Sequence, residues 1–404
     1  MFKAHRPSSR LLRGTQHGAS PHWSRAHDAP HRHLVSSTPS HRTEHLLATA
    51  GRRAAHLKFK YAVLAAAALI VAAGCGGPAE AGNSGQKLAL DAPLPASVPD
   101  GTKIVVGDPA TQVAFKLSGQ LDKVEKYVKF ANLSGGPQTT EAFRAHALDL
   151  GSVAEIPAIH ATWTGLKVKI VASKFRQDAI NHPIYELGIA PGVNVKTLAD
   201  LKGKTIAFSP GQAQGSLVLK VLKKAGLTKD DVKLIELPST GDVYTNALAA
   251  KQVDVAPIGG VQIKRYTAKY GKDGATTIPH GIRDDAGHLY GPVESLEDPA
   301  KAAAIRAYVA AWGVAQEWID KHPKEWIAGY YVKDQGLTEA DGQWLVDNAG
   351  HPDITADWSS AITRNQETIE LLAAETKNPV IQAKDLYDLR FEAVAADAIK
   401  AGAK

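Results

Sequence analysis

Residues 205–224 read TIAFSPGQAQGSLVLKVLKK and have the pattern of a strand, a turn and a helix. Thr205–Phe208 is a short apolar run without polar alternation, which is typical of a strand covered by helices on both faces. We interpret the turn Ser209–Gln212 as a Ser-x-x-Gln capping box with Pro210 at the first helical position. The stretch therefore predicts a strand that leads into a helix, the repeating unit of an α/β fold.

Eight further runs of this kind lie between Lys103 and Ile278. Strands that alternate with helices predict largely parallel sheets with right-handed crossovers. The number of predicted strands exceeds what one lobe needs, so we predict two α/β lobes with a cleft between them. Lobe 1 is placed at residues 101–180 and 284–404, and lobe 2 at residues 181–283. The runs are Lys103–Val106, Val128–Ala131, Asp149–Val153, Val168–Ala172, Ile184–Ile189, Val232–Ile235, Val253–Ala256 and Thr276–Ile278.

After Asp298 the apolar residues recur at helical spacing, which predicts a helical C-terminal segment. The expected helices are Pro299–Lys321, Pro323–Val332, Glu339–Asn348 and Asp357–Glu375. Most of the large aromatic side chains of the chain lie on them, and we assign these side chains to the core and to helix packing. The aromatic residues are Trp312, Trp318, Trp326, Tyr330, Tyr331, Trp344 and Trp358.

The N-terminal part differs in charge from the rest of the chain. Residues 1–74 carry 11 Lys and Arg against 2 Asp and Glu, which leaves 36 basic and 39 acidic side chains after residue 74. A nucleic-acid-binding protein needs its basic surface on the folded part, so this class is excluded. Residues 1–51 are rich in His, Arg, Ser and Pro without apolar periodicity. We expect them to be disordered or to precede the true start of translation.

Residues 52–74 resemble a bacterial lipoprotein signal. Basic residues precede the apolar run Tyr61–Ala73, which as a helix would rise about 20 Å and is too short to cross a hydrocarbon core of about 30 Å. Cys75 is the only cysteine and follows small residues, so the resemblance implies that it is lipidated. Residues 75–100 are predicted to be the lipid anchor and a flexible tether. We therefore expect anchoring on the outer face of the cytoplasmic membrane, in the periplasm where an outer membrane is present.

The turns that follow the predicted strands carry glycines and polar side chains but no Lys or Arg. Such turns direct backbone N–H groups and helix N-termini at one region, which suits a small oxyanion. Helix capping alone is the competing explanation for each hydroxyl, including a second capping box from Ser152 to Glu155. The candidate ligand contacts are Asp108, Thr111, Gln112, Gly151, Ser152, Ser209, Gly211, Gln212, Gln214, Gly215, Ser216, Thr240, Gly259 and Gly260.

Three other residues have two interpretations. Lys174 and Arg176 follow a predicted strand, and we interpret them as a solvated surface run, with a cation for the ligand as the alternative. Trp163 belongs either to the core or to the wall of the cleft. No catalytic signature of the G-x-S-x-G, H-E-x-x-H, G-x-x-x-x-G-K or G-x-G-x-x-G type occurs. We therefore predict no catalytic residue, no metal and no cofactor.

Several stretches together resemble one family of transport proteins. Asp200–Phe208, DLKGKTIAF, is similar to the D-L-K-G-K-x-(apolar)-x segment of periplasmic solute-binding proteins. The stretches Leu217–Val232 and Gln252–Val255 continue the similarity, and Ala142–Val153 is similar to a segment that ends in a ligand-lining Gly-Ser. The order resembles that of the aliphatic sulfonate, taurine and nitrate family of ABC-transporter binding proteins, over residues 103–375. The departure is Pro257–Val261, where many relatives have an aromatic-rich stretch.

The resemblance implies a periplasmic-binding-protein type 2 fold, in which two lobes close on a ligand by bending at a hinge. It implies a monomer that delivers a small anion, an aliphatic sulfonate or taurine-like compound, to an ABC permease with its cytoplasmic ATPase. It also implies ligand contacts at Gly151 and Ser152, at the Ser209–Ser216 turn and at the turn after the first strand. The alternatives are a heteroaromatic ligand such as a thiamine precursor, with Trp163 in an aromatic sandwich, and a surface enzyme.

Overall fold

The structure is a computed structural model, and it describes residues 87–402. The predictions for residues 1–51, for the signal segment 52–74 and for Cys75 lie outside the described residues. No helix within residues 87–402 combines the length and the apolar character that a bilayer crossing requires.

Residues 87–100 pack against the folded part of the chain. The Leu88 N–H donates to the Glu297 carbonyl at 2.7 Å, and the Arg390 guanidinium donates to the carbonyls of Ala89 and Ala92. Leu90, Leu94 and Val98 contact the hydrophobic core. The prediction of a free tether is therefore wrong for residues 87–100, because their apolar side chains are spaced so that they can be buried.

Lobe 1 is built on a six-stranded mixed sheet. Val106 of β1 pairs in parallel with Leu150 of β3, whereas Leu289 of β10 pairs antiparallel with Ser152. β10 runs antiparallel because the chain returns to this sheet from the other lobe. The predicted parallel arrangement is therefore correct for β1, β2 and β3, whereas the antiparallel β10 is a strand that the sequence did not predict. The strand order is β11 (Pro352–Asp353), β4 (Val168–Arg176), β10 (Gly287–Pro292), β3 (Leu150–Ala154), β1 (Ile104–Gly107) and β2 (Val128–Phe130).

Lobe 2 is built on a five-stranded sheet with the order β7 (Lys233–Glu236), β6 (Thr205–Phe208), β8 (Val255–Gly259), β5 (Tyr185–Ile189) and β9 (Thr276–Ile278). Alternate residues of a strand point to opposite faces of the sheet. Ile206 packs accordingly with α5 (Ala213–Lys224) on one face, and Ala207 packs with α6 (Val243–Ala249) on the other. The apolar run that lacks polar alternation is thus a strand covered on both faces, as predicted.

All nine predicted strands are present, and the predicted C-terminal helices form with one change. The segment predicted as Pro323–Val332 is divided into the short α10 and a π-helical stretch. The remaining helices are α1 (Pro109–Leu117), α2 (Leu121–Val124), α3 (Gly136–Arg144), α4 (Ile156–Trp163), α7 (Val261–Tyr270), α8 (Val293–Glu297), α9 (Pro299–Lys321), α10 (Pro323–Trp326), α11 (Glu339–Ala349), α12 (Ser359–Thr376) and α13 (Val394–Gly402); the π-helix is Ile327–Asp334, and 3-10 turns are Leu198–Leu201, Lys229–Asp231, Gly271–Asp273, Ala383–Leu386 and Leu389–Phe391.

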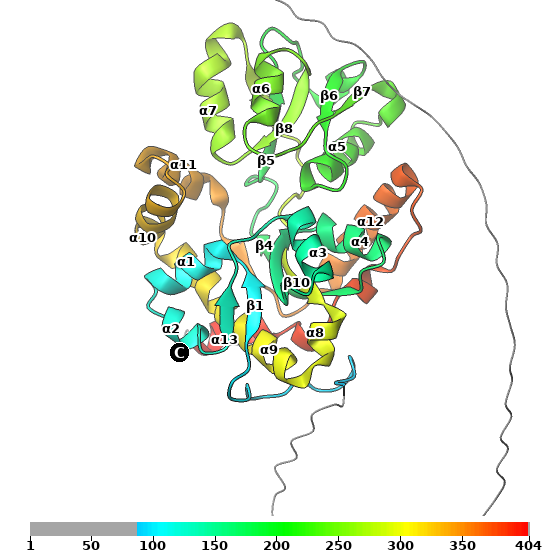
Figure 1. Ribbon diagram of the computed structural model, residues 1–404. Coiled ribbons are helices and arrows are strands. Elements are labelled where there is room, and N and C mark those ends of the chain that lie inside the picture. Colours follow the sequence, from blue (N-terminus) through cyan, green and yellow to red (C-terminus); the bar gives the residue numbers. More distant parts are fainter. Residues whose placement is uncertain (1–86, 403–404) are drawn as a thin grey trace, which may run out of the picture. The chain divides into compact units, whose positions relative to one another are not determined.

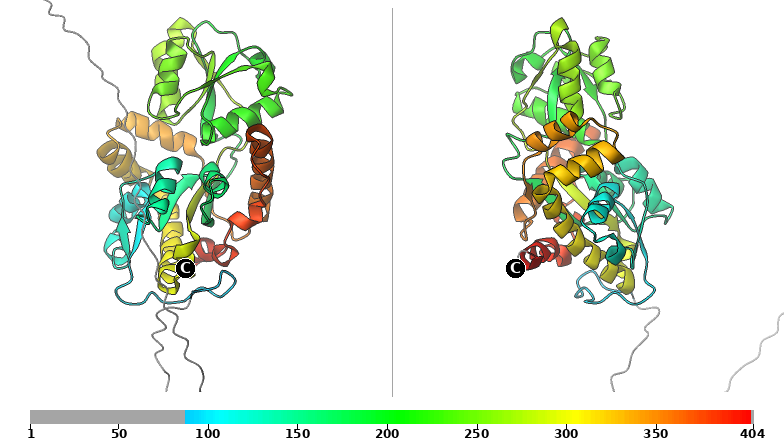
Figure 2. Two further views of the ribbon diagram at one scale, coloured as in Figure 1. Left: turned by 45° about the vertical axis from the view of Figure 1, so that its right-hand side comes forward. Right: turned by 90° about the vertical axis from the view of Figure 1, so that its left-hand side faces the viewer.

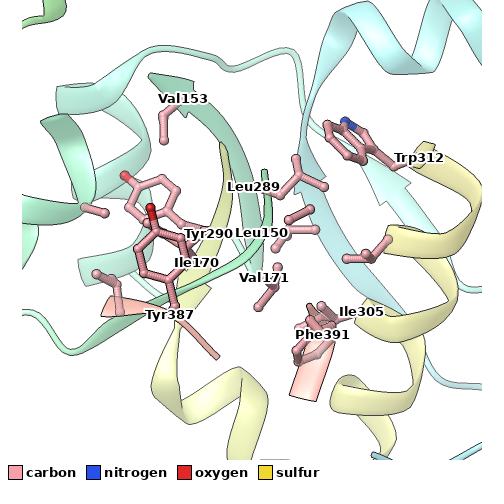
Figure 3. Packing of buried hydrophobic residues seen from close by; sticks show 14 of the residues in the cluster. Leu150, Val153, Ile170, Val171, Leu289, Tyr290, Ile305, Trp312, Tyr387 and Phe391 are labelled. Atoms are coloured by element: carbon pink, nitrogen blue, oxygen red, sulfur yellow. The ribbon is translucent and has the colours of Figure 1, made fainter. Parts of the chain in front are cut away.

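The core of lobe 1 lies between its sheet and α9. Figure 3 shows Leu150, Val171 and Leu289, from the adjacent strands β3, β4 and β10, beside Ile305 and Trp312 of α9. Ile305, Leu150 and Leu289 are fully buried. Each buried aliphatic side chain of this size contributes about 1.5–3 kcal/mol of transfer free energy, so α9 is fixed firmly across the sheet. The position of α9 matters because its C-terminal half reaches the site described below.

Two connecting segments, residues 177–184 and 279–286, join the sheets. The predicted limits of the lobes, 180/181 and 283/284, fall within these segments and remain our proposed limits. Helices of lobe 1 also contact lobe 2 on two sides: α11 packs on α7, and α12 packs on α5 (Figures 1 and 2). Asp341 of α11 pairs with Lys264 and Arg265 of α7 at 2.9 and 2.7 Å.

Candidate functional site

A cavity of about 440 Å³ lies at the edge of the lobe 1 sheet, where β1, β3 and β4 end. Ligands of open α/β sheets bind at this edge, beyond the carboxyl ends of the strands. We call it the first cavity. Its lining combines polar side chains from the strand ends with large side chains from α9 to α11: Asp108, Thr111, Ser152, Lys174, Phe175, Arg176, Ile184, Asp285, Trp312, Gln316, Ile319, Asp320, Trp326, Tyr331 and Val346 are among the lining residues.

Asp108 is the first polar residue after β1 and begins α1. Its Oδ1 accepts from the Thr111 N–H at 3.4 Å, and Pro109 occupies the first helical position, so Asp108 is the N-cap of α1. Its Oδ2 accepts from the Tyr308 hydroxyl at 3.2 Å. The residue is only 3% exposed, and burial raises the pKa of its carboxyl group. Asp108 is therefore fixed at the cavity wall by the helix that it caps.

Two cations enter the first cavity from β4. Lys174 and Arg176 are alternate residues, so their side chains lie on the same face of the strand. Lys174 Nζ donates to Gln316 Oε1 at 2.6 Å, and Gln316 Nε2 donates to Thr111 Oγ1 at 3.2 Å. Arg176 Nη1 donates to the His182 carbonyl at 2.8 Å. The interpretation of Lys174 and Arg176 as a solvated surface run is wrong, because Gln316 of α9 holds Lys174, the segment after β4 holds Arg176, and both side chains are only partly exposed.

These cations have no acidic partner in close contact. Among residues 87–402, no carboxylate oxygen lies within 4 Å of Lys174 Nζ or of the Arg176 guanidinium. Burial lowers the pKa of both groups, with the more distant Asp108 opposing this for Lys174 and Asp284 for Arg176. Buried cations without a paired carboxylate are costly, and an anionic ligand would offset that cost.

The other carboxylates of the first cavity already have partners. Asp285 accepts from the Arg283 guanidinium and from the Arg176 backbone N–H, each at 2.7 Å. Asp320 lies 2.9 Å from His351 Nδ1. The charges left for a ligand are therefore mainly the positive ones on β4, so the cavity is suited to an anionic group.

The opposite wall of the first cavity is aromatic. Trp312 and Trp326 are 4% and 5% exposed and belong to the core, yet both also line the cavity together with Tyr331. The Trp326 and Tyr331 rings meet edge to face at 6.1 Å between centroids. The assignment of these aromatics to core packing is therefore correct for Trp312 and Trp326 but incomplete. Trp163, the residue proposed for the cleft wall, donates its indole N–H to the Pro379 carbonyl and lines neither this cavity nor the next.

A second cavity, of about 550 Å³, lies on the other side of the connecting segments. Its wall comes from the start of α4, from α5 along its whole length, from α12 and from residues 282–286. It shares only Ala154, Phe175, Asp285 and Ala286 with the first cavity. Glu155 of its wall pairs with Lys220 at 2.9 Å.

The candidate ligand contacts are distributed unevenly. Asp108, Thr111 and Ser152 line the first cavity, and Ser216 lines the second. Thr240 is exposed and lines neither cavity. The same two linings also lack Gln112, Gly151, Ser209, Gly211, Gln212, Gln214, Gly215, Gly259 and Gly260, for which ligand contact stays a prediction.

Packing accounts for several of these residues. A Cβ on Gly215 would lie 2.1 Å from the Ser209 carbonyl oxygen, and one on Gly151 would lie 2.3 Å from Thr139 Cγ2. The Ser209 hydroxyl donates to the Leu237 carbonyl at 2.6 Å and accepts from the Tyr244 hydroxyl at 2.6 Å. Close contact of α5 with its turn therefore requires glycine at 215, whether or not a ligand is bound.

Neither predicted capping box forms. α4 begins at Ile156 with Glu155 as N-cap, and Ser152 lies inside β3. α5 begins at Ala213 with Gln212 as N-cap, so Ser209 and Pro210 precede the helix by several residues. In the first case the strand ends one residue later than predicted and Ser152 pairs in the sheet. In the second case the turn is longer than predicted, because Ser209 bonds to the Leu237 carbonyl at the end of the neighbouring strand.

Part of the sequence matches the model of a known protein family. The family model described as NMT1/THI5 like matches residues 128–325. The matched region includes β4 with both cations, all of α9 and all of lobe 2.

Curated relatives match a shorter part of the chain. A putative aliphatic sulfonates-binding protein of Escherichia coli (strain K12) is 32% identical over 112 residues, 27% of this chain and 33% of the relative. A putative binding protein of Brucella abortus (strain 2308) is 35% identical over 126 residues, 31% of this chain and 36% of the relative. The match thus spans about a third of the length of these relatives.

Solved structures share the fold over a larger part. The periplasmic aliphatic sulphonate binding protein SsuA from Escherichia coli superposes with a TM-score of 0.57 at 21% identity, covering 72% of this chain and 92% of that chain. The alkanesulfonate-binding protein SsuA from Xanthomonas axonopodis pv. citri, bound to MOPS, superposes with a TM-score of 0.58 at 22% identity, covering 72% of this chain and 99% of that chain. The chain has this periplasmic-binding-protein fold.

The same fold also occurs in an enzyme. The desulfurization enzyme DSZB gives a TM-score of 0.52 at 15% identity, covering 73% of this chain and 99% of that chain. The fold alone therefore does not separate a binding protein from an enzyme. In the part of the chain that the structure describes, no group of three or more His, Cys, Asp or Glu side chains is arranged to hold a metal ion.

Proposed function

We propose that the chain is the extracytoplasmic solute-binding component of an ABC importer and captures a small organic anion in the first cavity. The observation that carries this proposal is the pair Lys174 and Arg176, two cations on one strand that no carboxylate neutralises at close range within residues 87–402. A charge-assisted hydrogen bond to such a cation is about twice as strong as a neutral one, so two of them favour an anionic head group.

An aliphatic sulfonate or a taurine-like compound is the ligand that we propose first. The relatives and solved structures named above support this choice, since several bind or are named for sulfonates. The apolar wall formed by Trp312, Ile319 and Val346 supports it as well, because it suits the hydrocarbon part of such a molecule.

A heteroaromatic ligand such as a thiamine precursor is the second candidate. One observation favours it: Trp312, Trp326 and Tyr331 line the first cavity, and aromatic rings stack well on such side chains. This replaces Trp163 as the residue of the proposed aromatic sandwich. A sulfonate that carries a ring would use both the cations and the aromatic wall.

We further propose that the protein is a monomer, anchored through lipidated Cys75 on the outer face of the cytoplasmic membrane, in the periplasm where an outer membrane is present. It would deliver its ligand to a permease that a cytoplasmic ATPase drives. The family match and the shared fold support the importer role, whereas the anchor rests on the sequence of residues 52–75.

Thermal unfolding against a ligand panel tests the function. The panel contains alkanesulfonates, taurine, sulfate, nitrate and pyrimidine thiamine precursors, each with the purified protein near neutral pH. A ligand at about 100 times its dissociation constant stabilises the protein by about 2.7 kcal/mol, which raises the unfolding midpoint measurably. We expect a rise with organic sulfonates that Arg176→Gln abolishes and Arg144→Gln, an exposed control, retains.

The same assay separates the alternatives. A rise with the heteroaromatic compounds alone would replace the anion by the second candidate. If no panel member raises the midpoint, the proposed binding function is wrong. If a ligand is consumed during prolonged incubation, the chain is an enzyme, and the binding proposal fails on that ground.

A further inference from the structure

The second cavity has a feature that points to a ligand of its own. Ser216, the fourth residue of α5, is 4% exposed and lines the cavity. Its hydroxyl is buried and has no hydrogen-bond partner among the residues that the structure describes. A buried hydroxyl without a partner is costly, so such a group normally bonds to a ligand or a water molecule. Ser209, seven positions earlier in the turn before α5, has two internal partners instead.

α5 presents a polar face to this cavity. Its lining residues recur at helical spacing, three or four positions apart, while the opposite face packs in the core of lobe 2. The polar face carries Ser216, Lys220, Lys223 and Lys224. Of these cations only Lys220 is held by a carboxylate at close range, that of Glu155.

A further cation comes from α12. The Arg364 guanidinium lies over the Phe175 ring at 5.1 Å, and Phe175 lines the cavity too. Within residues 87–402, no carboxylate lies within 4 Å of Lys223, Lys224 or Arg364. Arg283 is held by Asp285 at 2.7 Å. Asp284 accepts from the backbone N–H groups of Ile184 and Tyr185, and Glu367 of α12 is a further carboxylate of the lining. The lining thus carries five cations against four carboxylates, and the cations without a carboxylate within 4 Å lie on α5 and α12.

The rest of the wall is apolar. Ile156, Leu217, Ile282 and Leu371 line the cavity beside Phe175. A volume of about 550 Å³ is within the range of pockets that hold organic molecules and exceeds what an inorganic ion needs. We propose that the second cavity is a separate binding site for an organic anion, with its apolar body against these side chains and its acid group at the Ser216 hydroxyl and the free cations.

The site would connect the two lobes. α5 belongs to lobe 2 and α12 to lobe 1. Lys229, in the 3-10 turn that follows α5, already forms an ion pair at 3.2 Å with Glu375 of α12. A ligand that contacts both helices stabilises the arrangement in which they are close.

Calorimetric titration of the purified protein with 1-octanesulfonate tests the proposal, with octanoate and sulfate as parallel probes. We expect two sites for octanesulfonate, one in each cavity, and no second site for sulfate. Ser216→Ala should weaken one site about 10- to 150-fold, the loss of one hydrogen bond to a charged group, and should not lower the unfolding midpoint of the free protein. Arg364→Gln should weaken the same site.

Two further variants make the assignment specific. Leu371→Trp, which fills the cavity from α12, should remove the Ser216-dependent site, and Arg176→Gln should weaken only the other one. A single site for octanesulfonate that does not respond to Ser216→Ala or Arg364→Gln would overturn the proposal. Two sites of which neither responds to Ser216→Ala or Arg364→Gln would overturn it as well. If Arg176→Gln affects neither site, the proposed binding in the first cavity is wrong, whereas the proposal for the second cavity is not affected.

Discussion

Replacing Lys174 by methionine should separate a ligand-binding role from a structural one. Methionine keeps the length of the side chain and removes the ammonium group, whose only direct partner among the described residues is Gln316 Oε1 at 2.6 Å. The change removes a partly buried charge that burial already disfavours, since the pKa of Lys174 is lowered, and it leaves one amide oxygen without its donor. These two effects oppose each other and are each about 1 kcal/mol, so we expect the free energy of unfolding to change by less than about 1 kcal/mol.

The affinity for the anion should change much more. A hydrogen bond to a charged group contributes about 1.5–3 kcal/mol, which corresponds to a rise in the dissociation constant of about 10- to 150-fold. Calorimetric titration measures the affinity and urea unfolding measures the stability, with Lys116→Met, on the exposed face of α1, as the matched control. An unchanged affinity together with a loss of more than 3 kcal/mol in stability would refute the reasoning, because Lys174 would then act as the structural counter-ion of Asp108.

Four further predictions concern pH, a buried hydroxyl and the anchor. Anion affinity should fall as the pH rises toward 10.5, beginning at lower pH than for an ordinary lysine because the pKa of Lys174 is lowered, and Lys174→Met should flatten this dependence in calorimetric titrations. Burial lowers the pKa of His288 from 6.5 to about 4 in the folded protein. Between pH 6.5 and 4 the unfolded state therefore binds more protons than the folded state, so the free energy of unfolding decreases as the pH falls, by ~3 kcal/mol in all. In urea unfolding, the free energy of unfolding should decrease less between pH 7 and pH 4.5 for His288→Gln than for the unmodified protein. An equal decrease in both would exclude His288 as the cause. Ser209→Ala should lower the free energy of unfolding by about 1–3 kcal/mol, since it leaves the Leu237 carbonyl and the Tyr244 hydroxyl unpaired, and a value near zero would contradict the described bonds. Cys75→Ala should move the protein from the membrane fraction to the soluble fraction, and continued membrane association would rule out the lipid anchor.

The sequence predicts the strands well wherever an apolar run is continuous. It misses β10, although this strand lies inside the sheet of lobe 1, between β4 and β3. The stretch Gly287–Pro292, GHLYGP, has glycines and a proline at positions where a pattern search expects a turn. Its pairing with β3 and β4 comes from residues more than 100 positions earlier, a contact that no local pattern contains.

The candidate site is harder to predict for a related reason. Lys174 is covered because α9 brings Gln316 to it, 142 positions further along the chain. A charged run after a strand is usually solvated, so the local pattern favours the wrong interpretation. Ser209 and Ser216 belong to one turn and helix start, yet one is bonded to Tyr244 and the other has an unpartnered hydroxyl in a cavity. Residue type and spacing alone do not distinguish them.

The central claim is that an organic anion binds in the first cavity on the cations of β4, and a crystal structure of the complex tests it most directly. The ligand would be the panel member that raises the unfolding midpoint most. We expect oxygen atoms of its acid group within hydrogen-bonding distance of Lys174 Nζ or of the Arg176 guanidinium, with its apolar part against Trp312. A ligand found only in the second cavity, at Ser216, with neither Lys174 nor Arg176 in contact, would contradict the claim.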